Sequence, residues 1–546
     1  MFIFNPKAYF MKIKTKYFLI WLILLAGMGA SAQIKQKTVD PRKTTQKFDA
    51  IMQIINYFYV EDVDQPKLAE EAIVAVLKEL DPHSVYIPKE EVERTNEPLV
   101  GNFDGIGVQF QIFKDTILVI SPVAGGPSEK LGIMAGDKII KINNEDAFGT
   151  KINNQYVFDR LRGPKGTTVD VSIFRKGYKG LIEYTITRDK IPLNSIDASY
   201  MISNDIGYIK LSRFARTSAD EFRDAAIELK KQGMKNLIFD LRGNTGGYLD
   251  IASELADEFL PVGKLMVYTK GLRSPKQDFI ATAGGTFEKG KLVVLIDEGS
   301  ASASEIVSGA VQDWDRGLIM GRRSFGKGLV QRPYMLPDSS MVRITTARYY
   351  TPSGRCIQKP YEDGKEEYAE DIYKRYKHGE MIHADSIKFP DSLRYYTQNQ
   401  RVVYGGGGIM PDYFIPFDTT FASKYYTDVF RKGLLNEFTL QYIETHRKDF
   451  LVAYPDIKAF KSGFVDDQKL LDEFIAFAEN KEIPRNDKDL AASGTQIKVI
   501  LKAMIARNLF NLNAYFQVVS ATDDDLTKAI EVINDDSLFR KLSLAK

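Results

Sequence analysis

The chain has 546 residues, enough for three or more domains, and its 44% hydrophobic and 27% charged residues are typical of a globular protein. A formal net charge of +2 argues against nucleic acid or an acidic polymer as a partner bound by bulk electrostatics. Cys356 is the single cysteine, so no intramolecular disulfide can form and stability must come from hydrophobic cores.

Residues 1–32 have the pattern of a secretory signal peptide. Several lysines precede a short apolar run at 18–26, and Ala30 to Ala32 forms an A-x-A site, which predicts cleavage after Ala32. The apolar run is shorter than the ~20 residues that span a bilayer, so an uncleaved anchor is the less favoured alternative. We therefore expect an exported protein that contacts a membrane only if the signal is retained.

Residues 33–98 are predicted to form a helical N-terminal region. Apolar residues follow helical spacing in two stretches, 48–58 and 68–80, and the second ends at Asp81-Pro82. His83 follows at once, and we interpret it as a turn residue rather than as a member of a catalytic triad.

Short strands and glycine turns dominate residues 99–180, and this region resembles a PDZ domain. Phe110 occupies the place of the third glycine in G-x-G-x-x-G, which excludes a nucleotide-binding loop. The resemblance implies that a peptide adds as a strand beside the sheet. It also implies that the C-terminal carboxylate is held by the loop formed by Gly105, Ile106, Gly107 and Val108.

Arg162 lies in turn-rich, basic sequence near the end of this module. We consider it a candidate to sense the bound tail and to signal to a catalytic domain. The alternative is a solvated arginine.

Residues 190–416 alternate between strands and helices, which predicts a largely parallel sheet. The stretches 206–211 and 236–240 are predicted strands, and a helix is predicted over 219–232. A glycine-rich loop follows the second strand over 240–247, at the carboxyl end where open α/β sheets place their sites.

A buried strand is predicted over 292–296, followed by small residues and a helix. Ser302 lies at that strand-to-helix turn, where its hydroxyl is exposed and the next N–H groups point towards an anion. Lys327 lies between Gly326 and Gly328 in an apolar context, which lowers a lysine pKa from its usual ~10.4. A neutral lysine amine can remove a proton from a serine hydroxyl. The spacing alone fits equally well a surface lysine in a loop.

The segments Ser302–Glu305 and Phe325–Gly328, together with Gln331, resemble the carboxyl-terminal processing (tail-specific) proteases. The resemblance implies that Ser302 is the nucleophile, that Lys327 is the general base and that Gln331 orients the lysine. It also implies an oxyanion hole, which would be made by the Ala303 amide with Gly246 or Gly247.

These observations favour a multidomain α+β protein with an α/β Ser-Lys catalytic core, an inserted PDZ-like domain and helical N- and C-terminal regions. Its expected function is a serine endopeptidase of the bacterial periplasm or cell envelope, needing no metal or other cofactor, that cleaves polypeptides near their free C-termini. The non-enzymatic alternative is a PDZ scaffold that binds protein tails without cutting them.

Three other chemistries fit less well. The four histidines, His83, His378, His383 and His446, lie outside the segments that match a catalytic core, and G-x-S-x-G is absent. Ser324 and Lys327 satisfy S-x-x-K, but S-D-N and K-T-G are missing. The chain contains neither H-E-x-x-H nor a cysteine cluster, so a metal hydrolase is poorly supported.

Two regions have less definite predictions. Residues 361–400 are highly charged without a regular period, and we interpret them as an insertion or a mobile surface excursion. Residues 417–546 are predicted to be helical, with apolar stripes at 430–442 and 497–512, and are candidates to bind an adaptor or form a homodimer.

Overall fold

The computed structural model describes residues 40–465, 467–542 and 544, so the predicted signal peptide lies outside the described residues. Two compact units divide the chain between Ile73 and Val74. The helices α2 (Pro41–Phe58) and α3 (Gln65–Lys78) agree with the two helical stretches expected near the N-terminus. Within the described ranges, no helix is both long and apolar enough to cross a membrane.

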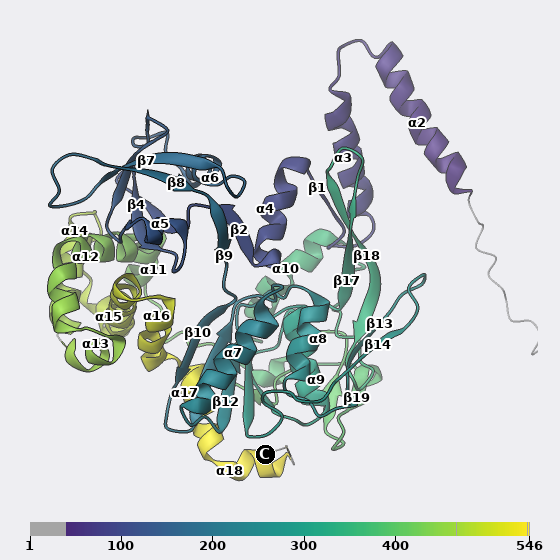
Figure 1. The fold of residues 1–546 in the computed structure, drawn as a ribbon. Coiled ribbons are helices and arrows are strands. Elements are labelled where there is room, and N and C mark those ends of the chain that lie inside the picture. Colours follow the sequence, from purple (N-terminus) through teal and green to yellow (C-terminus); the bar gives the residue numbers. More distant parts are fainter. Residues whose placement is uncertain (1–39, 466, 543, 545–546) are drawn as a thin grey trace, which may run out of the picture. The chain divides into compact units, whose positions relative to one another are not determined.

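A six-stranded sheet forms the centre of the second unit (Figure 1). Its spatial order is β10 (Ile196–Met201), β11 (Ile206–Leu211), β12 (Asn236–Asp240), β15 (Leu292–Ile296), β16 (Leu318–Gly321) and β21 (Tyr413–Phe414). Only β10 runs antiparallel to its neighbour, which confirms the prediction of a largely parallel sheet. The strand expected over 292–296 is β15, and all its residues are buried.

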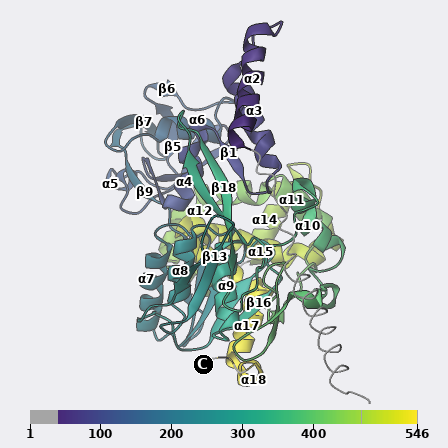
Figure 2. The same cartoon turned by 90° about the vertical axis from the view of Figure 1, so that its right-hand side faces the viewer.

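Helices cover both faces of this sheet (Figures 1 and 2). One face packs against α7 (Ser218–Lys231), α8 (Leu249–Asp257) and α9 (Ala303–Asp313), and the other against α17 (Asp524–Asn534) and α18 (Asp536–Lys541). Side chains alternate between the faces, so Val294 faces the first group of helices while Val293 and Leu295 face α17. Strand β15 thus packs against α7, α8 and α9 on one face and against the C-terminal helix α17 on the other.

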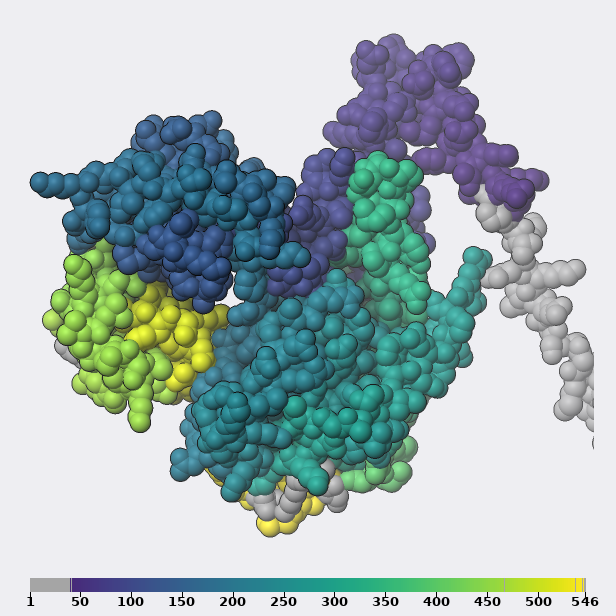
Figure 3. Space-filling view, in the orientation of Figure 1, coloured from purple at the N-terminus to yellow at the C-terminus, as the bar shows by residue number. Residues whose placement is uncertain are grey.

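A second sheet contains β17 (Leu329–Met335) and β18 (Met341–Tyr350), the two strands that follow Lys327. Its other members are β1 (Val85–Ile87), β13 (Leu265–Lys270) and β14 (Gln277–Ile280). The β17–β18 hairpin, green in Figure 3, extends away from the central sheet. The helix α4 (Lys89–Val100) follows β1 and leads into the β-rich module.

The β-rich module has its own core, a six-stranded sheet and a separate two-stranded sheet formed by β2 (Asn102–Gly105) and β9 (Asp189–Pro192). The strands of the larger sheet are β3 (Val108–Phe113), β4 (Thr116–Pro122), β5 (Lys138–Ile142), β6 (Glu145–Asp146), β7 (Thr168–Phe174) and β8 (Ile182–Thr187). The short α5 (Pro127–Lys130) and α6 (Asn154–Leu161) complete it. Ile117, Val157 and Ile173 are completely buried in this core, so the module has its own apolar interior.

Residues 361–400, which we interpreted as an insertion or a mobile surface excursion, contain regular elements. They contain α10 (Lys365–Lys377) and β19 (Arg394–Tyr396), which pairs with β20 (Val402–Tyr404). The helix escaped prediction because the side chains it buries are Tyr368 and Arg375 rather than an apolar stripe.

The C-terminal region is helical, as predicted. It comprises α11 (Lys424–Arg431), α12 (Leu434–Ala453), α13 (Ile457–Gly463), α14 (Asp467–Glu479), α15 (Asp487–Leu509) and α16 (Leu512–Val519), followed by α17 and α18. The expected stripe over 430–442 is interrupted, because Gly433 has a φ of +67° and separates α11 from α12. Phe430 is accordingly 64% exposed, whereas Phe438 is buried.

Candidate active site

Ser302 lies between β15 and α9, at the strand-to-helix turn predicted from the sequence. Its backbone has φ 55° and ψ −110°, a conformation that non-glycine residues rarely adopt. The Ser302 N–H donates to Glu305 Oε2 at 2.8 Å, and the Ser302 carbonyl accepts from the Tyr349 hydroxyl at 3.1 Å. Strained residues of this kind persist only where their surroundings fix them, and they cluster at functional sites.

Lys327 lies in a tight loop between β16 and β17. A Cβ on Gly326 would be 3.1 Å from Gly408 N, and one on Gly328 would be 2.8 Å from Gln358 N, so both positions need the close approach that glycine allows. Burial lowers the pKa of Lys327, although the nearby Glu305 carboxylate opposes this shift. Within the described part of the chain, no carboxylate forms an ion pair with Lys327 Nζ.

Arg343 and Asp81 have opposite effects on the pKa of Lys327. The Arg343 guanidinium lowers the pKa of Lys327 further, whereas the Asp81 carboxylate raises it, and burial is the largest influence. Arg343 is held by a hydrogen bond to Asn96 Oδ1 at 2.9 Å. The amine is therefore easier to deprotonate than a solvated lysine.

Ser302, Lys327 and Gln331 line one cavity of about 340 Å³. Gln331 Nε2 donates to Thr345 Oγ1 at 3.3 Å, and Thr345 Oγ1 donates to Asp81 Oδ1 at 3.0 Å. The cavity is also lined by Asn96, Leu99, Thr245, Gly246, Gly247, Tyr248, Leu249, Ile306, Leu329, Val330, Pro333, Arg343 and Tyr349. The three residues expected to form the catalytic group thus open onto the same space.

The glycine-rich loop after β12 lies against Ser302. A Cβ on Gly246 would be 2.8 Å from Ser302 Cβ and 2.9 Å from Ala303 N, so the two segments are in contact. Gly246 N already donates to Asn244 Oδ1 at 2.8 Å. Ala303 is the first residue of α9, and its N–H therefore has no acceptor within the helix.

Gly247 follows with φ +156°, where a Cβ would be 2.1 Å from the Phe214 carbonyl oxygen. Its neighbours on both sides hydrogen-bond to Phe214, because Phe214 N donates to the Gly246 carbonyl and Tyr248 N donates to the Phe214 carbonyl. The Gly247 N–H has no recorded acceptor among the described residues.

Glu305 is a central residue of the site that sequence reasoning did not assign. The carboxylate is completely buried and accepts four hydrogen bonds: from Ser302 N, Ser324 Oγ, Gly326 N and Lys327 N, at 2.5–2.9 Å. One side chain therefore fixes both the serine and the lysine loop. A signal was present, since a glutamate three residues after an N-cap serine is the capping-box pattern.

Replacing Glu305 by glutamine is expected to lower kcat for peptide cleavage by about 10²-fold or more. The carboxylate accepts four hydrogen bonds, whereas the amide NH₂ of glutamine would face N–H groups that also donate. Glu254→Gln is the matched control, because it makes the same carboxylate-to-amide change at an exposed position of α8 outside the site. Equal kcat values for Glu305→Gln and the control would contradict the positioning role.

His83 lies near the lysine but does not line the cavity. Its Nε2 is 2.9 Å from the Tyr368 hydroxyl, and burial, followed by the charge of Lys327, lowers the pKa of His83 to about 4. Its backbone N–H donates to Asp81 Oδ1 at 2.8 Å, as expected of a turn residue. His83 is thus neutral at physiological pH.

Ser324 is unsuited to the S-x-x-K alternative. Its side chain is buried, its Oγ donates to Glu305 Oε1 at 2.5 Å, and the same Oγ accepts from Ile409 N at 2.6 Å. Arg375 of α10 donates to the Ser324 carbonyl at 2.7 Å and to the Phe325 carbonyl at 3.1 Å. The segment predicted to be a surface excursion therefore supports the lysine loop.

The loop assigned to carboxylate binding borders a small groove between β3 and α6. Ile106, Gly107, Val108 and Arg162 are among the residues that line this cavity of about 40 Å³, whereas Gly105 lies in β2 outside the lining. Arg162 is not simply solvated: its guanidinium lies 4.4 Å from the ring centroids of both Phe103 and Phe158, and it pairs with Glu97 of α4. In the described residues, no group of three or more His, Cys, Asp or Glu side chains could hold a metal ion.

Family models match four stretches of the chain. Peptidase family S41 matches residues 205–365, a PDZ domain matches 96–173, the N-terminal domain of the activating protease CtpB matches 25–91, and a family of unknown function matches 425–511. The fold and these matches define a serine-type peptidase that carries a PDZ domain.

Individual relatives show the family to which the chain belongs. The carboxy-terminal-processing protease of Bartonella bacilliformis is 35% identical over 352 residues, which cover 63% of this chain and 80% of that protein. The carboxy-terminal processing protease CtpB of Bacillus subtilis is 35% identical over 338 residues, 61% and 69% of the respective chains. A solved photosystem II D1 C-terminal processing protease is 30% identical, covering 56% of this chain and 82% of that one, with a TM-score of 0.34. The chain belongs to the carboxy-terminal-processing protease family.

Proposed function

We propose that this protein is an exported serine endopeptidase that cleaves polypeptides near their C-termini with a Ser302–Lys327 dyad. The observation that carries the proposal is that a strained serine and a half-buried lysine of lowered pKa line the same cavity. Export is supported by the signal-peptide pattern of residues 1–32.

In the proposed reaction, neutral Lys327 Nζ removes the proton from Ser302 Oγ as that oxygen attacks a peptide carbonyl. The N–H groups of Ala303 and Gly247 then stabilise the oxyanion, since Gly246 N is engaged by Asn244. Collapse of the tetrahedral intermediate breaks the C–N bond, and Lys327 returns the proton to the leaving amine. Water hydrolyses the Ser302 ester by the same route.

Gln331 has an orienting role in this scheme. Its Nε2 donates to Thr345, so its Oε1 is left to accept a hydrogen bond from Lys327 Nζ. This second contact would keep the amine directed at the serine rather than at solvent.

The PDZ module would select the substrate by its tail. We propose that a free C-terminal carboxylate binds at the loop from Gly105 to Val108 and that the preceding residues lie in the groove beside α6. Arg162 borders this groove and pairs with Glu97 of α4, and Asn96 on the same helix lines the catalytic cavity. The effect of tail binding would thereby be transmitted to the active site through α4.

The test compares one peptide with a free and with an amidated C-terminus, and follows cleavage by mass spectrometry. We expect faster cleavage of the free form, a fluorophosphonate adduct at Ser302, and loss of the preference for the free form in Arg162→Ala. The non-catalytic alternative, a PDZ scaffold, predicts binding of the free tail with neither cleavage nor an adduct. Equal rates for the two peptides would contradict tail selection but not catalysis.

A further inference from the structure

The C-terminal segment brings two carboxylates to the loops of the active site. We propose that Asp523 and Asp525 are positioning residues of the peptidase, which hold in register the three loops that carry Gly247, Ser302 and Lys327. This inference rests on the proposed function, because it concerns the same site. It assigns a part in catalysis to a segment beyond the residues 205–365 that match the peptidase family.

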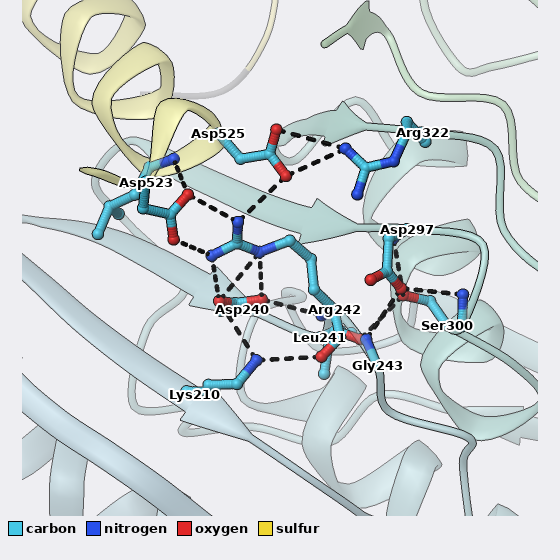
Figure 4. Close-up of polar contacts among 12 residues, drawn as sticks. Lys210, Asp240, Leu241, Arg242, Gly243, Asp297, Ser300, Arg322, Asp523 and Asp525 are labelled. Atoms are coloured by element: carbon cyan, nitrogen blue, oxygen red, sulfur yellow. Dashed lines mark hydrogen bonds and ion pairs between the residues drawn. The ribbon is translucent and has the colours of Figure 1, made fainter. Parts of the chain in front are cut away.

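Arg242 lies at the centre of the cluster that carries this inference (Figure 4). Its guanidinium donates to both carboxylate oxygens of Asp523, at 2.8 and 2.7 Å, and to Asp525 Oδ2 at 3.1 Å. It also donates to Asp240, whose side chain is completely buried, at 2.7–3.2 Å. Two-pronged contacts between arginine and carboxylate are strongly directional, so Asp523 helps Asp240 to fix the guanidinium, and Asp525 adds a third contact.

The backbone beside Arg242 is equally constrained. Lys210 Nζ donates to the Arg242 carbonyl at 3.0 Å, and Gly243 N donates to Asp297 Oδ1 at 2.9 Å. A shift of the Arg242 side chain would therefore be transmitted along the loop towards Gly247.

The same loop is tied to the segment that leads to the serine. Ser300 Oγ donates to the Leu241 carbonyl at 2.8 Å, and Ala301 N donates to the Asn244 carbonyl at 3.0 Å. The loop that carries Gly247 is therefore hydrogen-bonded to the segment that leads to Ser302.

Asp525 also reaches the loop that carries the lysine. Arg322 follows β16, shortly before Lys327, and its side chain is 8% exposed. Its Nη1 lies 3.3 Å from Asp525 Oδ2, while its Nε donates to Glu298 at 2.9 Å, just before Ser302. Asp525 thus contacts Arg242 and Arg322, which belong to the loops that carry Gly247 and Lys327. Arg322 is in turn linked through Glu298 to the loop that carries the serine.

The two carboxylates are themselves held firmly. Asp523 is the N-cap of α17 and accepts a hydrogen bond from Leu526 N at 3.0 Å. Leu526, Ala529 and Ile533 are buried against the central sheet, so the start of the helix is fixed relative to the strands. Groups that orient a catalytic site work best from rigid elements of this kind.

Asp525→Asn removes the negative charge between Arg242 and Arg322 while keeping the size of the side chain. The buried Arg322 guanidinium and the half-buried Arg242 guanidinium would then lie together with less compensation of their charges, which favours their separation. Displacing reacting groups by about 1 Å costs about 10²-fold in rate. Substrate binding at the PDZ groove does not involve this cluster and should change little.

The experiment measures peptide cleavage and the rate of Ser302 labelling by a fluorophosphonate in the full-length protein. For Asp525→Asn we expect kcat and the labelling rate to fall about 10- to 100-fold, with KM within about twofold of wild type. Asp524→Asn is the matched control, because Asp524 is exposed in the same helical turn. Asp525→Glu keeps the negative charge, so this variant should retain most of the wild-type kcat.

Wild-type kcat and labelling in Asp525→Asn would overturn the inference, and so would a lower thermal midpoint with unchanged kcat in the folded protein. Arg322→Lys is made in parallel, because it keeps the charge but loses the planar guanidinium. If Asp525→Asn does not fold, a wild-type kcat in Arg322→Lys overturns the inference and a reduced kcat supports it. A wild-type protein that neither cleaves nor becomes labelled would instead overturn the proposed function.

Discussion

Replacing Ser302 by alanine is expected to abolish peptide cleavage, with a loss in kcat of about 10⁴-fold or more. The change removes the oxygen proposed as the nucleophile and does not touch the groove beside α6. Glu305 continues to hold residue 302 through its backbone N–H, so the fold should be retained. Cleavage is measured by mass spectrometry of a tail-bearing peptide, and folding by circular dichroism.

Ser324→Ala is the informative comparison for this variant. Ser324 Oγ bonds to Glu305 and Ile409 N inside the protein, so its loss should weaken activity without abolishing it. If Ser302→Ala still cut peptides while Ser324→Ala did not, Ser324 would be the nucleophile and the site would need to be reassigned.

Replacing Lys327 by methionine is expected to lower kcat by about 10³- to 10⁴-fold, the upper range for a general base that acts on a serine. Methionine has a similar length but no proton acceptor of useful basicity. Because the burial of a charged amine is unfavourable, the thermal midpoint should not fall by more than a few degrees. Kinetics and thermal melting on the same preparation check both expectations.

Lys289→Met is the control for the lysine variant, since Lys289 is exposed in the turn before β15. A Lys327→Met protein with near-wild-type kcat would exclude the lysine as the base. A protein that had lost both its fold and its activity would point to a structural role for Lys327.

The sequence predicted the elements whose signals are local. The apolar run at 292–296, the small residues that follow it and the glycines on each side of Lys327 each carry their own cue, and each has the predicted conformation. Gly433 shows the limit of periodicity, because its positive φ ends a helix inside a stripe that otherwise looks continuous.

The supporting residues of the site could not be found in the same way. Glu305, Arg375 and Asp525 are charged side chains that are buried only because partners distant in sequence satisfy them. Charged residues are normally exposed, so a single sequence gives no reason to bury these three. Their burial depends on helices α9, α10 and α17, which the fold brings together with loops from distant parts of the chain.

The pH dependence of Ser302 labelling by a fluorophosphonate tests the central claim most directly. A general base acts in its neutral form, so the fluorophosphonate labelling rate should rise with pH through the lowered pKa of Lys327 and level off below the ordinary lysine value of ~10.4. Because the Arg343 guanidinium lowers the pKa of Lys327, Arg343→Met should move the midpoint of this rise to higher pH. A labelling rate independent of pH, or a midpoint that does not move in Arg343→Met, would contradict a neutral lysine as the base.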